Sequence, residues 1–167
     1  MKKINYKAFT LIEIIIASAI LIIILTAVYS FFNSNFKIIS RESKKTNIDS
    51  QAKTLIDNIN QWLQMADQNT IQYNEFRNVL DNSINYKKVQ FTIYQPSTTD
   101  IKIMFYPNTS SITIWNGSIS NKYLDGYIDD MQVDFQSGSY INIKIIVNYK
   151  MNNIKKTYEV FHNIRND

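Results

Sequence analysis

The chain of 167 residues lacks cysteine and contains one histidine, three glycines and two prolines. Without cysteine it has no disulfide framework, no thiolate metal site and no catalytic thiol. The single histidine, His162, excludes any metal or catalytic site that needs two histidines. Hydrophobic residues make up 45% of the chain and charged residues 19%, which excludes a disordered or collagen-like protein. The length fits one globular domain.

The formal net charge of +4 is concentrated at the N-terminus. Lys2, Lys3 and Lys7 lie in the first seven residues, and the rest of the chain has 15 basic side chains against 14 acidic ones. A basic leader before a nearly neutral body favours membrane topology over a nucleic-acid-binding surface.

Residues 9–32 are almost entirely apolar, and their only polar side chains are Thr10, Glu13, Ser18, Thr26 and Ser30. Residues 14–32 carry no charge, and as a helix they span about 28 Å, close to the hydrocarbon thickness of a bilayer. The lysines before this segment predict a cytoplasmic N-terminus, with the rest of the chain outside.

Three interpretations of this segment compete. A signal peptide has a shorter apolar region and a small-residue cleavage site after it, which is missing here. A plain membrane anchor fits the length but leaves Glu13 unexplained, since an ionisable residue in a membrane is costly and usually has a partner. Cleavage just before Phe9 supplies that partner, because it creates a positively charged amine four residues from Glu13.

The run Lys7-Ala8-Phe9-Thr10-Leu11-Ile12-Glu13 resembles the cleavage and methylation motif of type IV prepilins and type II secretion pseudopilins. The resemblance implies that residues 1–8 are a leader, which prepilin peptidase removes between Ala8 and Phe9 before it methylates the Phe9 amine. Ala8 stands where the family normally has glycine. The resemblance also implies that Glu13 neutralises the amine of a neighbouring subunit during assembly.

The same resemblance implies a structural filament subunit without a cofactor, rather than an enzyme. Its partners would be prepilin peptidase, other pilin or pseudopilin subunits and the cytoplasmic membrane, with later location in a pilus or pseudopilus. Ser30 lies where many major pilins carry a helix-kinking proline, which favours a minor pilin or minor pseudopilin.

The remaining sequence predicts an α+β fold, with the helix first and the strands after it. Apolar residues at helical spacing indicate one helix from about residue 9 to about residue 67, which could bend or melt at the polar residues 40–47. Residues 9–35 form its transmembrane or filament-core half. An amphipathic half, at about residues 36–67, would cover a sheet through the stripe Ile48, Ala52, Leu55, Ile59, Trp62 and Ala66. We call residues 36–167 the head.

Tyr73, Phe76 and Val79 or Leu80 allow a short second helix. From residue 87 to about residue 165, apolar residues alternate with polar ones, which predicts a mainly antiparallel sheet. The expected strands are residues 89–93, 101–105, 112–114, 131–135, 141–149 and 155–164. Turn signals lie at 95–97, 116–117, 138 and 151–153.

Few residues outside the motif are candidates for a catalytic or metal-binding role. His162 alternates with apolar residues in a strand, which favours a structural role. Asp125, Asp129 and Asp130 surround Gly126, but without EF-hand spacing, solvated loop carboxylates are favoured over a calcium site. No metal site is therefore predicted.

The leading hypothesis is a minor subunit of a type IV pilus, a type II secretion pseudopilus or a competence pilus. One alternative is a binding module at a filament tip, an adhesin or a DNA receptor, carried on the same anchor. Another is an uncleaved, single-pass membrane-anchored domain of unrelated role.

Overall fold

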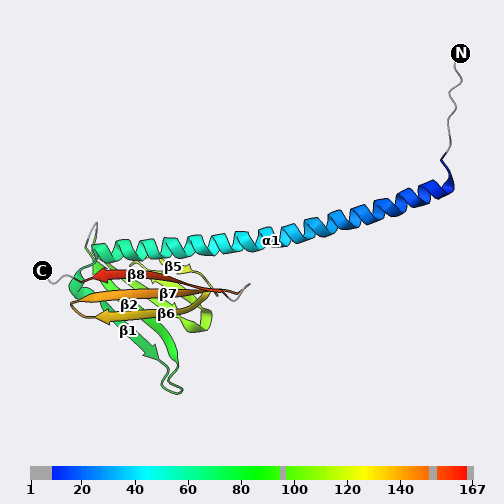
Figure 1. Cartoon of the computed structure of the whole chain (residues 1–167). Helices are drawn as coiled ribbons and strands as arrows, with labels where there is room; N and C mark the ends of the chain where they lie inside the picture. The colour runs from blue at the N-terminus through cyan, green and yellow to red at the C-terminus, as the bar shows by residue number, and fades with distance from the viewer. Residues whose placement is uncertain (1–8, 95–96, 151–153, 165–167) are drawn as a thin grey trace, which may run out of the picture. The chain divides into compact units, whose positions relative to one another are not determined.

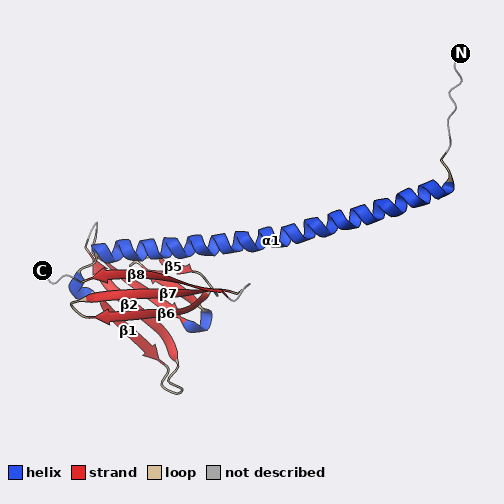
Figure 2. Cartoon of the chain, in the orientation of Figure 1, coloured by secondary structure: helices blue, strands red, loops and turns tan. Residues whose placement is uncertain are grey.

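The computed structural model describes residues 9–94, 97–150 and 154–164. Within these ranges the chain forms one long helix, then two short 3-10 helices and eight strands (Figures 1 and 2). The elements are α1 (Leu11–Met65), η1 (Gln68–Thr70), β1 (Gln72–Arg77), β2 (Ile84–Ile93), β3 (Thr99–Tyr106), η2 (Pro107–Thr109), β4 (Ser111–Trp115), β5 (Ser120–Tyr123), β6 (Ile128–Gln136), β7 (Tyr140–Tyr149) and β8 (Ile154–Asn163). The chain divides into two compact units, Met1–Ser43 and Lys44–Asp167.

The first unit consists, in its described part, of the N-terminal half of α1 and the two residues before it. No proline or glycine interrupts the sequence there, and α1 continues as regular helix through residues 40–47. The local melting that the polar stretch allowed does not occur. The large apolar side chains from Leu11 to Ile39 are all exposed, so this half of the helix has no core of its own.

The second unit begins with the C-terminal half of α1, whose apolar stripe covers the sheets (Figure 1). The predicted stripe is confirmed for Ile48, Ala52, Leu55 and Ile59, which are buried, and for Ala66, which is buried just after the helix ends. One turn later the buried residue is Leu63, while Trp62 packs against the core at its margin. The helix therefore has the spacing that places one narrow face against a sheet.

The strands form two antiparallel sheets, where the alternation alone predicted a single mainly antiparallel one. The larger sheet has the order β1-β2-β3-β4-β5 and the smaller has the order β6-β7-β8, so each is a simple meander. Alternate side chains of β2, β3 and β7 point into one shared core. The α+β class is confirmed, with the helix and both sheets contributing to that core.

The short helix predicted around residues 73–80 is wrong, because residues 72–77 form strand β1 instead. Backbone pairing with β2 outweighs the local spacing of apolar residues: Tyr73 lies opposite Val89, and Phe76 lies opposite Tyr86. The turn that follows exposes Val79 by 98% and Leu80 by 94%, so neither belongs to a buried helix face.

The sheets therefore begin at residue 72 rather than at residue 87, and β5 is a further strand that the alternation did not indicate. The six expected strands are otherwise present as β2, β3, β4, β6, β7 and β8. The β6–β7 hairpin turns at Gly138, whose positive φ of 73° suits glycine. The expected turn at 151–153 lies outside the described residues, as do residues 95 and 96 of the turn expected at 95–97.

Two buried or half-buried ionic contacts join the layers of the second unit. Lys87 of β2 is buried, and its Nζ donates to Asp130 Oδ1 and to the Met131 carbonyl, both at 2.7 Å, which ties the larger sheet to β6. Asp49 of α1 ties the helix to the smaller sheet, because its Oδ1 accepts hydrogen bonds from the hydroxyls of Tyr149 and Tyr158 and from Lys156 Nζ at 3.0 Å.

These contacts change the ionisation of the residues around Asp49. The hydrogen bond from Tyr149, the one from Tyr158 and the nearby Lys156 hold the pKa of Asp49 well below its usual range. Burial, and then the Asp49 carboxylate, raise the pKa of Tyr158 to about 12. The carboxylate is therefore ionised, and both tyrosines are neutral donors, throughout the physiological range.

Asp49→Asn should lower the free energy of unfolding at pH 7 by about 1–3 kcal/mol, because it replaces charge-assisted hydrogen bonds with neutral ones. Since the folded pKa is the depressed one, this contribution is complete above the unfolded pKa of about 3.9 and declines as the pH falls below it. Denaturation of the full chain in mild detergent, followed by circular dichroism at pH 7 and pH 3, measures both effects. Asp57→Asn, on an exposed part of the same helix, is the control. A deficit for Asp49→Asn that is the same at both pH values would contradict the assignment.

Candidate processing and assembly site

The helix start is fixed by a reciprocal pair of hydrogen bonds between Thr10 and Glu13. The Thr10 backbone N–H donates to Glu13 Oε2 at 2.8 Å, and the Glu13 backbone N–H donates to Thr10 Oγ1 at 3.3 Å. The Thr10 hydroxyl donates to the same Oε2 at 2.9 Å. This is a capping box, in which residues three apart satisfy the free N–H groups at the start of a helix.

The capping box explains why α1 begins at Leu11 and places the Glu13 carboxylate at the positive end of the helix dipole. Both hydrogen bonds to the Glu13 carboxylate come from Thr10 and are accepted by Oε2, so among the described residues Oε1 has no hydrogen-bond partner. The carboxylate can therefore accept from a second donor without giving up the cap.

Phe9 directly precedes the cap and its side chain is 81% exposed. In the intact chain its nitrogen is a peptide amide, and only cleavage after Ala8 would turn it into an ammonium within one helical turn of Glu13. Ala8 and the leader lysines Lys2, Lys3 and Lys7 lie outside the described residues. The structure thus describes the part of the predicted site that follows the predicted cleavage point.

Thr10 is the residue of this site to which the sequence argument gave no role. The sequence does contain the pattern that indicates this role, because Thr-x-x-Glu before an apolar run is the spacing of a capping box.

The helix after the cap has the length and apolar composition needed to cross a membrane. Its isoleucines and leucines from residue 11 to residue 25 are each more than half exposed. Such a continuous apolar surface on all sides of a helix requires lipid or other helices around it.

The acidic residues near Gly126 do not converge on one point. Asp125 pairs with Lys122 at 2.7 Å, Asp129 with Lys155 at 2.6 Å, and Asp130 with the buried Lys87. Across the described ranges, no cluster of three histidine, aspartate or glutamate side chains is placed to hold a metal ion. These carboxylates act as partners of three separate lysines.

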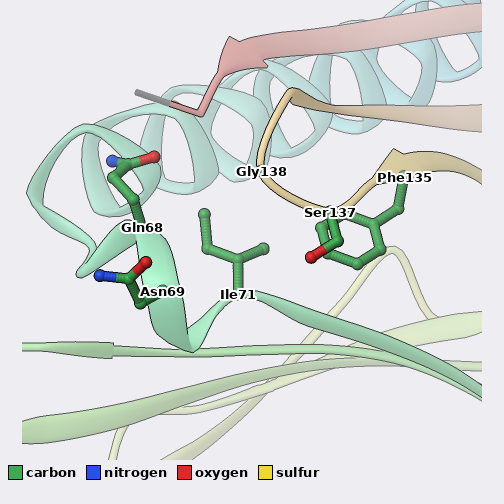
Figure 3. A pocket seen from close by; sticks show the side chains of 6 residues that line it. All are labelled: Gln68, Asn69, Ile71, Phe135, Ser137 and Gly138. Atoms are coloured by element: carbon green, nitrogen blue, oxygen red, sulfur yellow. The ribbon is translucent and has the colours of Figure 1, made fainter. Parts of the chain in front are cut away.

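His162 lies half-buried on β8 and bonds to Gln68 of η1 through its Nε2, with 3.1 Å to Gln68 Oε1. Gln68 also lines a hollow of about 330 Å³ between η1 and the β6–β7 turn (Figure 3). Figure 3 shows Gln68 and Asn69 on one side of Ile71, with Ser137 and Phe135 on the other. The lining residues that the structure describes offer amide, hydroxyl and apolar groups and no ionisable side chain.

Thr10→Val should loosen the first turn of α1, because it removes the hydroxyl that accepts from Glu13 N–H and donates to its carboxylate. An N-cap of this kind is worth about 1 kcal/mol, so we expect amide hydrogen exchange at residues 11–14 to become about fivefold faster. Hydrogen exchange of the full chain in detergent micelles measures the change. Thr10→Ser keeps the hydroxyl and should leave the exchange rates near those of the original chain. Equal acceleration in both variants would show that the hydroxyl is not the cap.

Residues 3–29 match the family model described as the prokaryotic N-terminal methylation motif. No curated protein and no solved structure is matched by the chain. The motif implies processing by prepilin peptidase and assembly with other pilin subunits, and together with the apolar helix it is consistent with membrane anchoring. The chain therefore carries the prokaryotic N-terminal methylation motif on a long helix packed against antiparallel sheets, as expected of a precursor of the type IV pilin and pseudopilin family.

Proposed function

We propose that this protein is a minor pilin or minor pseudopilin, a structural subunit of a type IV pilus, a type II secretion pseudopilus or a competence pilus. The observation that carries the proposal is the position of Glu13. Its carboxylate is held by Thr10 at the start of an exposed apolar helix, inside a matched methylation motif.

In this proposal, residues 1–8 are a leader that prepilin peptidase removes between Ala8 and Phe9, and the new Phe9 amine is then methylated. Lys2, Lys3 and Lys7 hold the leader at the cytoplasmic face until it is cut. Residues 9–35 anchor the subunit in the membrane and later enter the filament core. The part of the head that holds the buried core, residues 44–167, stays in water throughout.

Assembly then depends on the match between two charges in an apolar environment. A lone carboxylate within a membrane helix costs about 2.5–3.5 kcal/mol near the helix centre and less near its end. An ammonium faces a similar cost, and bringing the two together offsets part of both. Because Thr10 occupies Oε2, the free Oε1 is the atom that we assign to the Phe9 amine of a neighbouring subunit.

Glu13→Val should be processed like the original chain yet fail to enter filaments, because the neighbouring amine loses its counter-charge. In the native host, intact mass should show loss of residues 1–8 and gain of one methyl group for both proteins. The filament fraction should contain about tenfold less of the variant, or still less, in line with the cost of an unpaired charge.

Glu42→Val is the matched control, since Glu42 is exposed on the same helix beyond the apolar segment. Normal incorporation of Glu13→Val would contradict the pairing mechanism. An original chain that keeps residues 1–8 beside an active prepilin peptidase would favour the uncleaved membrane-anchored domain instead.

The proposal places the head on the outer side of the membrane. Basic residues also follow the apolar segment, at Lys37, Arg41, Lys44 and Lys45, so the distribution of lysine and arginine does not by itself decide the orientation. We assign the head to the outer side because the leader is proposed to be cut at the cytoplasmic face. Ion pairing does not neutralise this second group, because within the described residues none of the four forms a salt bridge.

A single introduced cysteine can report the orientation, because the chain has none of its own. Ser118→Cys, in an exposed turn between β4 and β5, should react with a membrane-impermeant maleimide in intact spheroplasts. Lys3→Cys, measured on precursor that has not been cleaved, should react only after the membrane is permeabilised. Gel-shift labelling follows both, and the reverse pattern would place the head in the cytoplasm.

A further inference from the structure

We propose that the outward face of the five-stranded sheet binds single-stranded nucleic acid. This inference goes beyond the filament role and does not depend on it, because it concerns the head alone. We call this surface the aromatic–lysine face. It is defined by Phe76, Tyr86, Lys88, Lys102, Tyr106 and Trp115.

Strand register places these residues on one side of the sheet. In β2, β3 and β4 the alternate positions, such as Val89, Ile103 and Ile114, are buried in the core, so the residues between them point away from it. Tyr86 lies opposite Phe76 of β1, and Lys102 lies opposite Trp115 of β4. The face therefore combines side chains from four strands.

Aromatic rings form a continuous row across three of these strands. The rings of Phe76 and Tyr86 stack with centroids 4.4 Å apart, and those of Tyr86 and Tyr106 lie 5.6 Å apart. Phe76 is 37% exposed, and the other rings are half-buried. Aromatic side chains on an antiparallel sheet are a stacking surface that nucleic acid bases of any sequence can use.

The lysines of this face keep their positive charge available. Lys88 Nζ lies 5.2 Å from the centre of the Phe76 ring, and Lys102 Nζ lies 4.2 Å from that of Trp115. Within the described ranges neither ammonium has a carboxylate in ion-pair distance. An aromatic ring positions an ammonium without neutralising it, so a phosphate can approach from the solvent side.

The smaller sheet shows the opposite arrangement on its own exposed surface. Lys144 pairs with Glu159 at 3.4 Å, and Lys155 pairs with Asp129 at 2.6 Å. Its stacked pair, Tyr140 and Phe161, has a carboxylate beside it, because the Tyr140 hydroxyl donates to Asp134 Oδ2. Lys144 and Lys155 of the smaller sheet are thus paired with carboxylates, whereas Lys88 and Lys102 of the aromatic–lysine face have no such partner among the described residues. Charge complementarity therefore favours the aromatic–lysine face for a polyanion.

The combination of aromatic rings and unpaired lysines favours single-stranded nucleic acid over other polyanions. A duplex hides the faces of its bases in the stack, so it could use the lysines but not the rings. A neutral glycan could use the rings but not the lysines. Only a flexible chain with both phosphates and open base faces matches both sets of side chains.

Binding is measured with a fluorescein-labelled oligo(dT) and the full chain in non-ionic detergent. Fluorescence anisotropy at low salt should rise, and Trp115 emission should be quenched in a Trp62→Phe background, which leaves Trp115 as the single tryptophan. With two lysines contacting phosphates, the slope of log K against log salt concentration should be about −1.4.

The double variant Lys88→Ala/Lys102→Ala should bind at least about tenfold more weakly, with an unchanged circular dichroism spectrum. Lys144→Ala/Lys155→Ala, on the smaller sheet, is the matched control and should bind within about twofold of the original chain. These lysines are on the surface, so the substitutions leave the core intact.

Four results would overturn the proposal: no binding at low salt, binding without Trp115 quenching, equal loss in the control, or equal affinity for a DNA duplex. Competition by inorganic polyphosphate as strong as that by unlabelled oligo(dT) would also overturn it, since it would show that base faces contribute nothing.

Discussion

The apolar surface of the first half of α1 constrains everything else in this protein. From Leu11 to Ile39 the large apolar side chains are exposed, and each square ångström of such surface costs about 25 cal/mol in water. No part of the described chain covers it. A membrane or neighbouring helices must therefore supply the missing contacts. Any polar group within the segment also needs a hydrogen-bond or charge partner. Glu13 is the one acidic residue there, and Thr10 donates two hydrogen bonds to its carboxylate from within the chain.

The capping box and the proposed intersubunit pair are compatible uses of one side chain. A carboxylate has about four acceptor positions, and Thr10 occupies positions on only one of its oxygens. In the proposed mechanism, the cap would keep the carboxylate in place while the subunit is alone in the membrane. The helix dipole favours the negative charge at this end. A neighbouring ammonium would then meet an acceptor already oriented, with little further loss of side-chain freedom.

Periodicity predicted most of the fold, since burial of one face leaves a regular pattern in α1 and in strands such as β7. It failed where pairing with residues distant in the sequence decides the local structure. Phe76 and Leu80 have helical spacing, yet Phe76 pairs with Tyr86 across β1 and β2, and Leu80 is exposed in the turn that follows. At the proposed site, the motif indicated Phe9 and Glu13. The aromatic–lysine face was not predictable, because net charge does not show which lysines lack partners, and strand register decides which rings adjoin.

The head owes its independence from the membrane segment to contacts made within residues 44–167. Every buried apolar side chain that the structure describes, from Ile48 to Ile164, belongs to this unit. Asp49 joins the helix to the smaller sheet and Lys87 joins the larger sheet to β6, so helix and sheets are tied by ionic contacts as well as by the core. A head built in this way does not rely on what surrounds residues 11–39. The N-terminal half of α1 can exchange lipid for protein neighbours without unfolding it, which is what assembly from a membrane into a filament requires.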